Sequence, residues 1–378
     1  MVIDVQKLKS AEEAKENKKQ SSLDGVFQKL NFLKRVSQKE IIFFAQNLQV
    51  MIRSGLALDR SLHTLAEQST NTKLKAILND LAKNTEMGVA LNESIKKYQR
   101  IFGAITVNMI KAGEVSGRLE DVLLQIYVQI KKNHEMKSKI KAAMIYPIIV
   151  IIAMIVIGVI MFIFVIPKIT SLFDQMEAEL PIATKILITV SNFTVHNGWI
   201  IFLIFFVAVS VFIASFRNKK ILYFYHSLAL RLPIFGEIIK KINLAKFSRT
   251  ISSLIKTDIP IVKTMQLTSQ VLGNVVYKNA LSESAKDLES GASLTDILKR
   301  YPKLFPPIII QMSMAGEETG SLDEILGEIA SFYEDEIDQI MKTLPSIIEP
   351  ILILILGVAV AGMAVAILMP MYSLTEQI

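Results

Sequence analysis

The chain repeats itself at a fixed 203-residue offset. Met109–Leu123 aligns without a gap on Met312–Leu326, and both stretches contain the pattern Ala-Gly-Glu-x-x-Gly. The same offset aligns Phe44 with Phe247, Gly88 with Gly291, Tyr98 with Tyr301, Phe102 with Phe305, Pro147 with Pro350 and Pro167 with Pro370. Both copies must adopt the same fold, and each leads into an apolar stretch, so the sequence predicts a duplicated scaffold rather than a single reaction pocket.

The chain is too apolar for an ordinary soluble protein. Of its 378 residues 51% are hydrophobic, and the mean hydropathy is +0.42. Three uncharged stretches exceed the roughly 20 apolar residues that a membrane-spanning helix needs. They are Ala142–Pro167, Ile186–Phe216 and Pro350–Thr375.

Basic residues beside these stretches predict the orientation, because lysine and arginine near a helix end resist translocation. Five lysines lie between Lys131 and Lys141, before the first stretch, and a basic cluster at 217–220 follows the second. The loop 168–198 has only two basic residues against three acidic ones. We therefore predict a multi-pass membrane protein with the N-terminus and both repeats in the cytoplasm, and with that loop and the C-terminus outside. For the third stretch, the predicted orientation rests on Lys342 alone.

The soluble repeats are predicted to be all-α. Ser37 and Glu40 fit a capping box, and Phe44, Leu48 and Met51 follow at helical spacing. Alternation with a period of two, which would indicate strands, is missing. The tail before Ser37 is polar and charged, which fits either disorder or a loosely held amphipathic helix. The predicted order is a tail (1–37), repeat one (38–143), a transmembrane helix (144–167), an external loop (168–198), a transmembrane helix (199–216), repeat two (217–346), a transmembrane helix (347–369) and an external tail (370–378).

The Ala-Gly-Glu-x-x-Gly pattern is the sharpest local signature. Its glycines are typical of a helix end and a chain reversal, and its Glu could cap a neighbouring helix or meet a basic partner. A purely structural turn is the plainer interpretation. The spacing also matches the small-residue motif of membrane helix pairs, but the polar surroundings argue against that use. The candidate partner-contact residues are Gly113, Glu114, Gly117, Gly316, Glu317 and Gly320.

Four more candidates lie where the first and third spans begin: Tyr146, Pro147, Glu349 and Pro350. An acid at this depth is either functional or simply hydrated at the headgroup level. The prolines fit the first helical turn, with Pro167 and Pro370 just beyond the last, and a mechanical role is the alternative.

Small residues recur in the third span, at Gly357, Ala361, Gly362 and Ala366. Their spacing of four would let another helix approach closely. They predict a packing seam, within one chain or between two.

Catalytic chemistry finds no support in the sequence. Cysteine is absent, the four histidines are scattered, and no Gly-Lys pair marks a phosphate loop. The acidic run Glu334–Asp338 fits a solvated face better than a divalent-ion site. The net charge of +7 fits attraction to anionic lipid rather than nucleic acid. We therefore predict no enzyme, no cofactor and no metal.

Taken together, these residues resemble the inner-membrane platform proteins of type IV pilus assembly and type II secretion, the PilC-like or F-type family. The resemblance covers residues 38 to 370. Besides both Ala-Gly-Glu-x-x-Gly elements, it rests on Ser54-Gly55, Tyr146-Pro147, Val165-Ile166-Pro167-Lys168, Leu180-Pro181 with Thr184, and Leu232-Pro233-Ile234-Phe235-Gly236. One departure is Asp258-Ile259-Pro260, where the family has Ser-Gly-Val-Pro, which puts the geometry of that turn in doubt. The tail before Ser37 matches no motif.

The resemblance implies two cytoplasmic six-helix bundles on three transmembrane helices, assembled as a homo-oligomer. It implies a cytoplasmic assembly ATPase, pilin or pseudopilin subunits, other inner-membrane assembly components and membrane lipid as partners. We hypothesise that bundle movement reaches the spans through Pro147 and Pro350. A small transporter and a signalling adaptor are the alternatives. The sequence leaves the choice between pilus, secretion and DNA uptake open.

Overall fold

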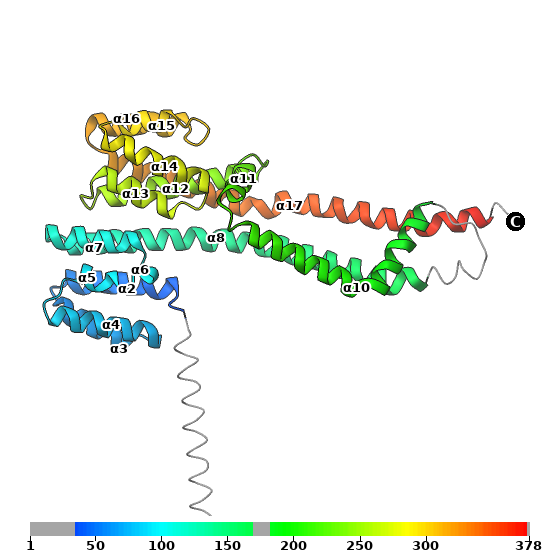
Figure 1. Ribbon diagram of the computed structural model, residues 1–378, viewed down its shortest axis with the longest axis horizontal. Helices are drawn as coiled ribbons and strands as arrows, with labels where there is room; N and C mark the ends of the chain where they lie inside the picture. Colours follow the sequence, from blue (N-terminus) through cyan, green and yellow to red (C-terminus); the bar gives the residue numbers. More distant parts are fainter. Residues whose placement is uncertain (1–34, 169–181, 376–378) are drawn as a thin grey trace, which may run out of the picture. The chain divides into compact units, whose positions relative to one another are not determined.

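The computed structural model describes residues 35–168 and 182–375, and across these ranges the chain forms helices and no strand (Figure 1). This confirms the all-α prediction. Residues 1–34 of the predicted N-terminal tail and residues 169–181 of the predicted external loop lie outside the described residues, and residues 182–198 of that loop are helical. The chain divides into two compact units. The first comprises the chain up to Glu135 with Lys246–Val271 and Ala280–Ala330, and the second comprises Met136–Ala245, Leu272–Asn279 and the chain from Ser331 onward.

The first unit is built from two similar sets of helices. The first set is α2 (Gln38–Arg53), α3 (Leu58–Gln68), α4 (Thr72–Glu86), α5 (Leu91–Lys96), α6 (Gln99–Phe102), α7 (Ala104–Ser116) and the start of α8 (Leu119–Ile160). The second set is the end of α12 (Phe235–Ile255), α13 (Ile261–Val271), most of α14 (Val275–Glu289), α15 (Leu294–Lys299), α16 (Pro307–Thr319) and the start of α17 (Leu322–Thr375).

The sequence repeat is a structural repeat. The helices α13, α14, α15, α16 and α17 each begin at the repeat offset from their counterparts α3, α4, α5, α7 and α8. Phe44 and Phe102 pack with ring centroids 5.2 Å apart, and their counterparts Phe247 and Phe305 do so at 5.0 Å. Two bundles with one design are therefore confirmed.

The first helix begins as its sequence predicts. The Ser37 hydroxyl accepts from the Glu40 N–H at 3.3 Å, and the Glu40 carboxylate accepts from the Ser37 N–H at 2.6 Å. This reciprocal pair satisfies two of the donors that a helix start leaves free. One face of α2 then buries Phe44 and Leu48 in the core of the bundle.

The two bundles share that core. Leu254, Ile259 and Leu267 of the second repeat are buried in one hydrophobic cluster with the core residues of the first. The buried Gln129 side chain also donates to the Thr250 hydroxyl, at 3.4 Å. Burying each large apolar side chain contributes roughly 1.5–3 kcal/mol, so this shared surface stabilises both repeats at once.

The second unit contains the membrane helices and the segments beside them. It holds the rest of α8, the π-helix η1 (Met161–Val165), α10 (Ile182–Ser215), α11 (Lys219–Ala229), the start of α12 and the rest of α17. Within residues 35–168 and 182–375, two helical stretches are long and apolar enough to cross a membrane, Leu119–Lys168 and Leu322–Val365. The predicted middle span is instead a pair of helices bent by 62°, which counts as a third span only if the pair crosses as one. Asn197, which has non-helical dihedral angles, lies in its first arm.

The interpretation of the prolines as helix ends is wrong. Pro147 lies in the interior of α8 and Pro350 in the interior of α17, because both helices begin in the soluble bundle and continue into the apolar stretch. Pro370 is likewise inside α17, and Pro167 is still helical. An interior proline removes one hydrogen bond of a helix without ending it when packing or lipid holds both sides.

The π-helix explains how Pro167 is accommodated. In a π-helix each N–H donates to the carbonyl five residues back, as Ile166 does to Met161. Pro167 has no N–H, so the next carbonyl in this ladder, that of Phe162, loses its intrahelical donor. The Ser191 hydroxyl of α10 donates to that carbonyl at 2.6 Å. This bond joins η1 to α10 inside an apolar stretch.

Replacement of Ser191 by alanine should lower the stability of the membrane region by about 1 kcal/mol, since it leaves a carbonyl without a donor where water is scarce. Thermal unfolding of the full chain in detergent measures this. Thr194→Ala is the matched control, because the Thr194 hydroxyl donates to the Val190 carbonyl of its own helix. Equal effects of the two substitutions would contradict the assignment.

The acidic run of α17 is held by lysines. Asp338 pairs with Lys139 of α8 at 2.8 Å and with Lys342 at 3.0 Å, and these hydrogen bonds lower the pKa of the Asp338 carboxyl. Glu336 pairs with Lys241 of α12 at 3.2 Å. Part of the run therefore ties helices together instead of forming a purely solvated face.

In the second repeat a helix before the bundle, α11, caps α14. The Val275 N–H donates to His226 Nδ1 at 2.9 Å, and the Asn274 side chain donates to the His226 carbonyl at 3.2 Å. Nδ1 can accept only when it is unprotonated, and burial lowers the pKa of the His226 imidazole. The neutral ring is thus part of the folded structure.

Acidification should weaken this contact. Because the folded pKa of His226 lies below its unfolded value of about 6.5, the stabilisation is complete above that pH and is lost as the pH falls through it toward the folded pKa. We expect the unfolding temperature of the full chain to drop between about pH 7.5 and 5.5, and to drop less in His226→Asn, which keeps an acceptor that does not titrate. Identical pH profiles for the two proteins would refute this role of His226.

Candidate functional site: the joints between bundles and long helices

Each Ala-Gly-Glu-x-x-Gly element forms the joint between a bundle and a long helix. Gly117 (φ 69°, ψ 11°) separates α7 from α8, and Gly320 (φ 70°, ψ 12°) separates α16 from α17. Glycine adopts this left-handed conformation at little cost. The Arg118 N–H reaches back to the Gly113 carbonyl at 2.9 Å, which closes the turn.

The first glycine of each element lets the long helix pack closely. A Cβ on Gly113 would lie 2.9 Å from the Cβ of Val122, and one on Gly316 would lie 2.9 Å from the Cα of Leu322. Real Cβ atoms essentially never approach so closely. Gly113 therefore allows the start of α8 to pack closely against α7, and Gly316 allows the start of α17 to pack closely against α16.

The glutamate of each element caps a short helix of its own bundle. Glu114 accepts from the N–H groups of Leu91 and Asn92 at 2.6 and 2.7 Å, and from the Asn92 side chain at 2.6 Å. An anion at a helix start is favoured by both the free donors and the helix dipole. Of the two roles that the sequence allowed, capping is the one that the structure shows.

Glu317, the counterpart of Glu114 in the second repeat, makes the same arrangement. It accepts from the N–H groups of Leu294 and Thr295 at 2.6 and 3.1 Å, and from the Thr295 hydroxyl. The N-cap residues differ, because Ala90 makes no side-chain hydrogen bond, whereas Ser293 accepts from the Asp296 N–H. The first bundle therefore depends more on its glutamate.

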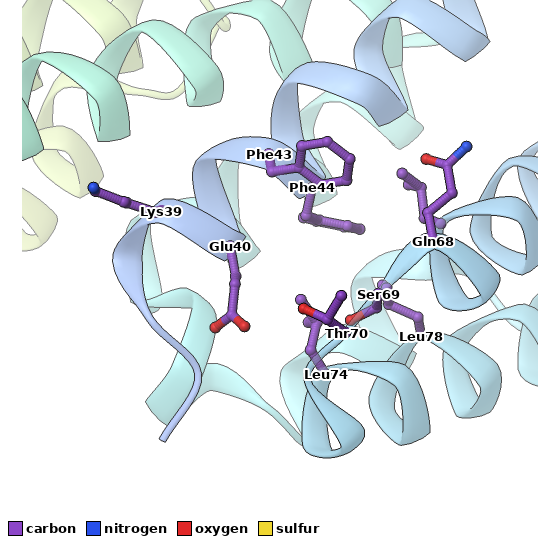
Figure 2. A pocket seen from close by; sticks show the side chains of 10 residues that line it. Lys39, Glu40, Phe43, Phe44, Gln68, Ser69, Thr70, Leu74 and Leu78 are labelled. Atoms are coloured by element: carbon purple, nitrogen blue, oxygen red, sulfur yellow. The ribbon is translucent and has the colours of Figure 1, made fainter. Parts of the chain in front are cut away.

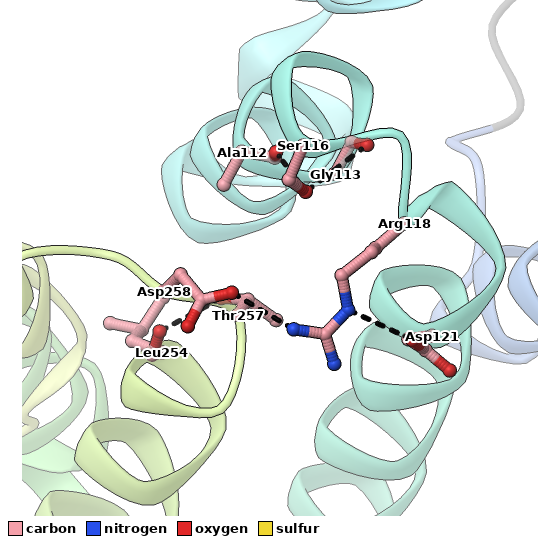
Figure 3. Close-up of polar contacts among 8 residues, drawn as sticks. All are labelled: Ala112, Gly113, Ser116, Arg118, Asp121, Leu254, Thr257 and Asp258. Carbon is pink, nitrogen blue, oxygen red and sulfur yellow. Dashed lines mark hydrogen bonds and ion pairs between the residues drawn. The ribbon is translucent and has the colours of Figure 1, made fainter.

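Arg118, the residue after Gly117, links the joint to the second repeat (Figure 3). Its guanidinium pairs with Asp121 at 3.1 Å and with Asp258 at 3.0 Å. Arg118 and Asp258 are 53% and 68% exposed, so the pair contributes only about 0–1 kcal/mol. It orients the two repeats more than it stabilises them.

The turn at Asp258 has the geometry of its counterpart despite the different sequence. Asp258 has a φ of 58°, and its counterpart Gly55 in the first repeat has a φ of 83°. Asp is one of the few residues that tolerate this region. The sequence departure therefore keeps the turn and adds a carboxylate within reach of Arg118.

The remaining sequence candidates lie on the long helices. Tyr146 is exposed and Pro147 buried in α8, whereas Glu349 and Pro350 are both exposed on α17. Within the described residues no hydrogen bond or ion pair joins these two pairs. They do not form one site with the glycine turns.

The small residues of the predicted seam lie along α17. Gly357, Ala361 and Gly362 are exposed, and nothing lies within 4 Å of a Cβ built on either glycine. The side chain of Ala366 is outside the described part. The seam is thus open to a further helix or to lipid.

The described residues contain no group of three or more His, Asp or Glu side chains that could hold a metal ion. The joints use their charged groups for capping and pairing, so what they can do is mechanical: they fix the start of each long helix to its bundle.

Sequence reasoning missed several residues that the structure makes important: Ser191, His226, Arg118 and the caps Asn71 and Asn274. The two asparagines could have been found, because they are counterparts at the 203-residue offset, and each accepts helix-start N–H groups. The others form contacts that no local pattern indicates.

Known proteins resemble this chain over nearly its whole length. The sequence model of the family described as type II secretion system (T2SS), protein F, matches residues 44–167 and 247–370. The type IV pilus assembly protein PilC of Pseudomonas aeruginosa is 33% identical over 343 residues, which cover 90% of this chain and 91% of that protein. The type IV pilus assembly protein TapC of Aeromonas hydrophila is 32% identical, with 90% and 83% covered. The type II secretion system protein F of the same organism is 28% identical, with 92% and 89% covered.

Proposed function

This chain belongs to the type II secretion system protein F family, and we propose that it is the inner-membrane platform of a type IV pilus or a type II secretion machine. The observation that carries the proposal is the continuity of α8 and α17, each of which begins at a bundle joint and continues as one helix into an apolar span. Such a helix can carry a displacement of the bundle into the membrane without any chemistry.

Both bundles lie in the cytoplasm in this proposal. The lysines between Lys131 and Lys141 and the basic cluster at 217–220 support that side. The protein then receives movement from a cytoplasmic assembly ATPase and passes it to pilin or pseudopilin subunits in the bilayer. It acts as a homo-oligomer together with other inner-membrane assembly components and lipid, and α17 offers its small-residue seam for helix contacts.

We favour the pilus pathway. Four relatives named for type IV pilus assembly are 31–33% identical over most of this chain, three named for type II secretion are 26–28% identical, and a type 4 fimbrial assembly protein is 25% identical. Deletion of the gene should then abolish surface filaments and leave exported enzymes unaffected, and the intact gene should restore the filaments. Loss of exported enzymes instead would assign the chain to secretion.

The tips of the joints are the proposed surface for the ATPase, since the glutamates themselves are occupied as caps. Val115, between Glu114 and Gly117, is 81% exposed. Val115→Asp should reduce co-purification of the ATPase about tenfold and leave the unfolding temperature unchanged. Met87→Asp, at another exposed apolar position, is the control. Equal binding by both variants would exclude this surface.

The alternatives predict different results. A transporter would give solute flux across liposomes reconstituted with the purified chain, whereas a platform would give none. A signalling adaptor would leave filaments and secretion intact when its gene is deleted.

A further inference from the structure

A pocket of about 270 Å³ opens on the first bundle between α2, α3 and α4 (Figure 2). Its walls are apolar and come from Phe43, Phe44, Leu65, Leu74 and Leu78. Figure 2 shows Lys39 and Glu40 on one side of the opening and Gln68 on the other. An open pocket with apolar walls favours an apolar occupant.

The counterpart position in the second bundle carries two larger side chains. Leu74 corresponds to Tyr277 and Ser69 to Leu272, and both of these larger side chains are buried. Phe43, which is 46% exposed beside the pocket, corresponds to the polar Lys246. The first bundle therefore has smaller side chains at two of these positions and an apolar side chain at the third.

In the second repeat the segment before the bundle lies beside this position, since His226 of α11 accepts from Asn274 and Val275. Tyr225 and His226 of α11 line a cavity together with Ile242, Asn243 and Gly273. These last three correspond, at the 203-residue offset, to Lys39, Glu40 and Thr70, which line the pocket of the first bundle. In the second repeat the residues at this position thus share a cavity with side chains of α11.

We propose that the N-terminal segment, residues 1–34, docks in this pocket as α11 docks on the second bundle. The segment directly precedes α2, as α11 precedes α12 in the second repeat. Val26, Phe27, Leu30 and Leu33 recur in it at helical spacing, so it can offer one apolar stripe.

The short connection favours this occupant over a second copy or another protein. Only a few residues separate Leu33 from Lys39 at the rim, and each spans up to about 3.4 Å. A tethered segment has an effective concentration in the millimolar range, which a free partner rarely reaches.

The absence of cysteine in the chain permits a direct test. In the full-length protein, purified in detergent, the pair Leu30→Cys with Gln68→Cys should form an intrachain disulfide about tenfold faster than Leu30→Cys with Glu93→Cys. Glu93 is exposed on α5 and does not line the pocket. Equal rates would overturn the proposal, and crosslinks between two chains would assign the pocket to a second copy instead.

A third variant tests the pocket itself. Adding Leu74→Tyr, the residue of the second repeat, should fill the space and reduce the intrachain rate to that of the control pair. Ser69→Leu, which also copies the second repeat, serves if Leu74→Tyr does not fold. An unchanged rate in a folded, filled variant would show that the segment lies elsewhere and would refute the proposal.

Discussion

Replacement of Glu114 by alanine is expected to destabilise the protein by about 3 kcal/mol. The substitution leaves the N–H groups of Leu91 and Asn92 and the Asn92 side chain without their charged acceptor, in a partly buried place. Hydrogen bonds to charged groups each contribute about 1.5–3 kcal/mol, and water can replace only some of them here. Thermal and guanidinium unfolding of the full chain in detergent measures the loss.

The duplication supplies the controls for this prediction. Glu317→Ala should cost less, about 2 kcal/mol, because Ser293 still caps α15. Glu318, the exposed neighbour of Glu317, should tolerate alanine within about 0.5 kcal/mol. If Glu114→Ala and Glu318→Ala behaved alike, capping by the glutamate would not matter to stability.

Replacement of Gly316 by alanine should destabilise the protein by about 2 kcal/mol, the middle of the range for overpacking, and impair assembly. The new methyl group would lie 2.9 Å from the Leu322 Cα, and a backbone atom cannot move aside as a flexible side chain can. Overpacking costs about 1–3 kcal/mol, which exceeds the gain of up to about 1 kcal/mol from the better helix propensity of alanine. The start of α17 must shift, so we expect fewer filaments even at normal protein levels.

Substitutions at two other glycines distinguish close packing from backbone conformation as the cause of the destabilisation. Gly320→Ala meets no atom but occupies a left-handed conformation, and should cost about 1 kcal/mol. Gly362→Ala lies in open space within α17 and should be neutral or stabilising. Unfolding measurements that ranked the three substitutions in another order would show that close packing at Gly316 is not the dominant effect.

Much of the fold follows from the sequence because its patterns are local or appear in both repeats. The Ser37 capping box, the paired aromatic contacts and the glycine turns all depend on residues close in sequence or on the 203-residue offset. The glutamate caps were one of two options that the motif allowed. The motif alone could not decide between capping a helix and meeting a basic partner, because the start of α5 lies 22 or 23 residues before Glu114.

The contacts that the sequence did not predict join distant residues. Ser191 meets a carbonyl that is free only because Pro167 follows a π-helix, and 29 residues separate the partners. Arg118 and Asp258 are 140 residues apart, and the nearby i,i+3 pair of Arg118 with Asp121 gives no sign of the longer contact. The prolines were misplaced because hydropathy marks where a helix becomes apolar and gives no sign of where it begins.

The core that Leu254, Ile259 and Leu267 share with the first repeat limits how the two copies can diverge. After a duplication, one repeat can in principle be lost or acquire a separate function. Here the loss of either repeat would expose the hydrophobic core surface of the other. Truncation between the two repeats should therefore yield poorly soluble fragments that aggregate. Selection must therefore act on the core residues of the two repeats together.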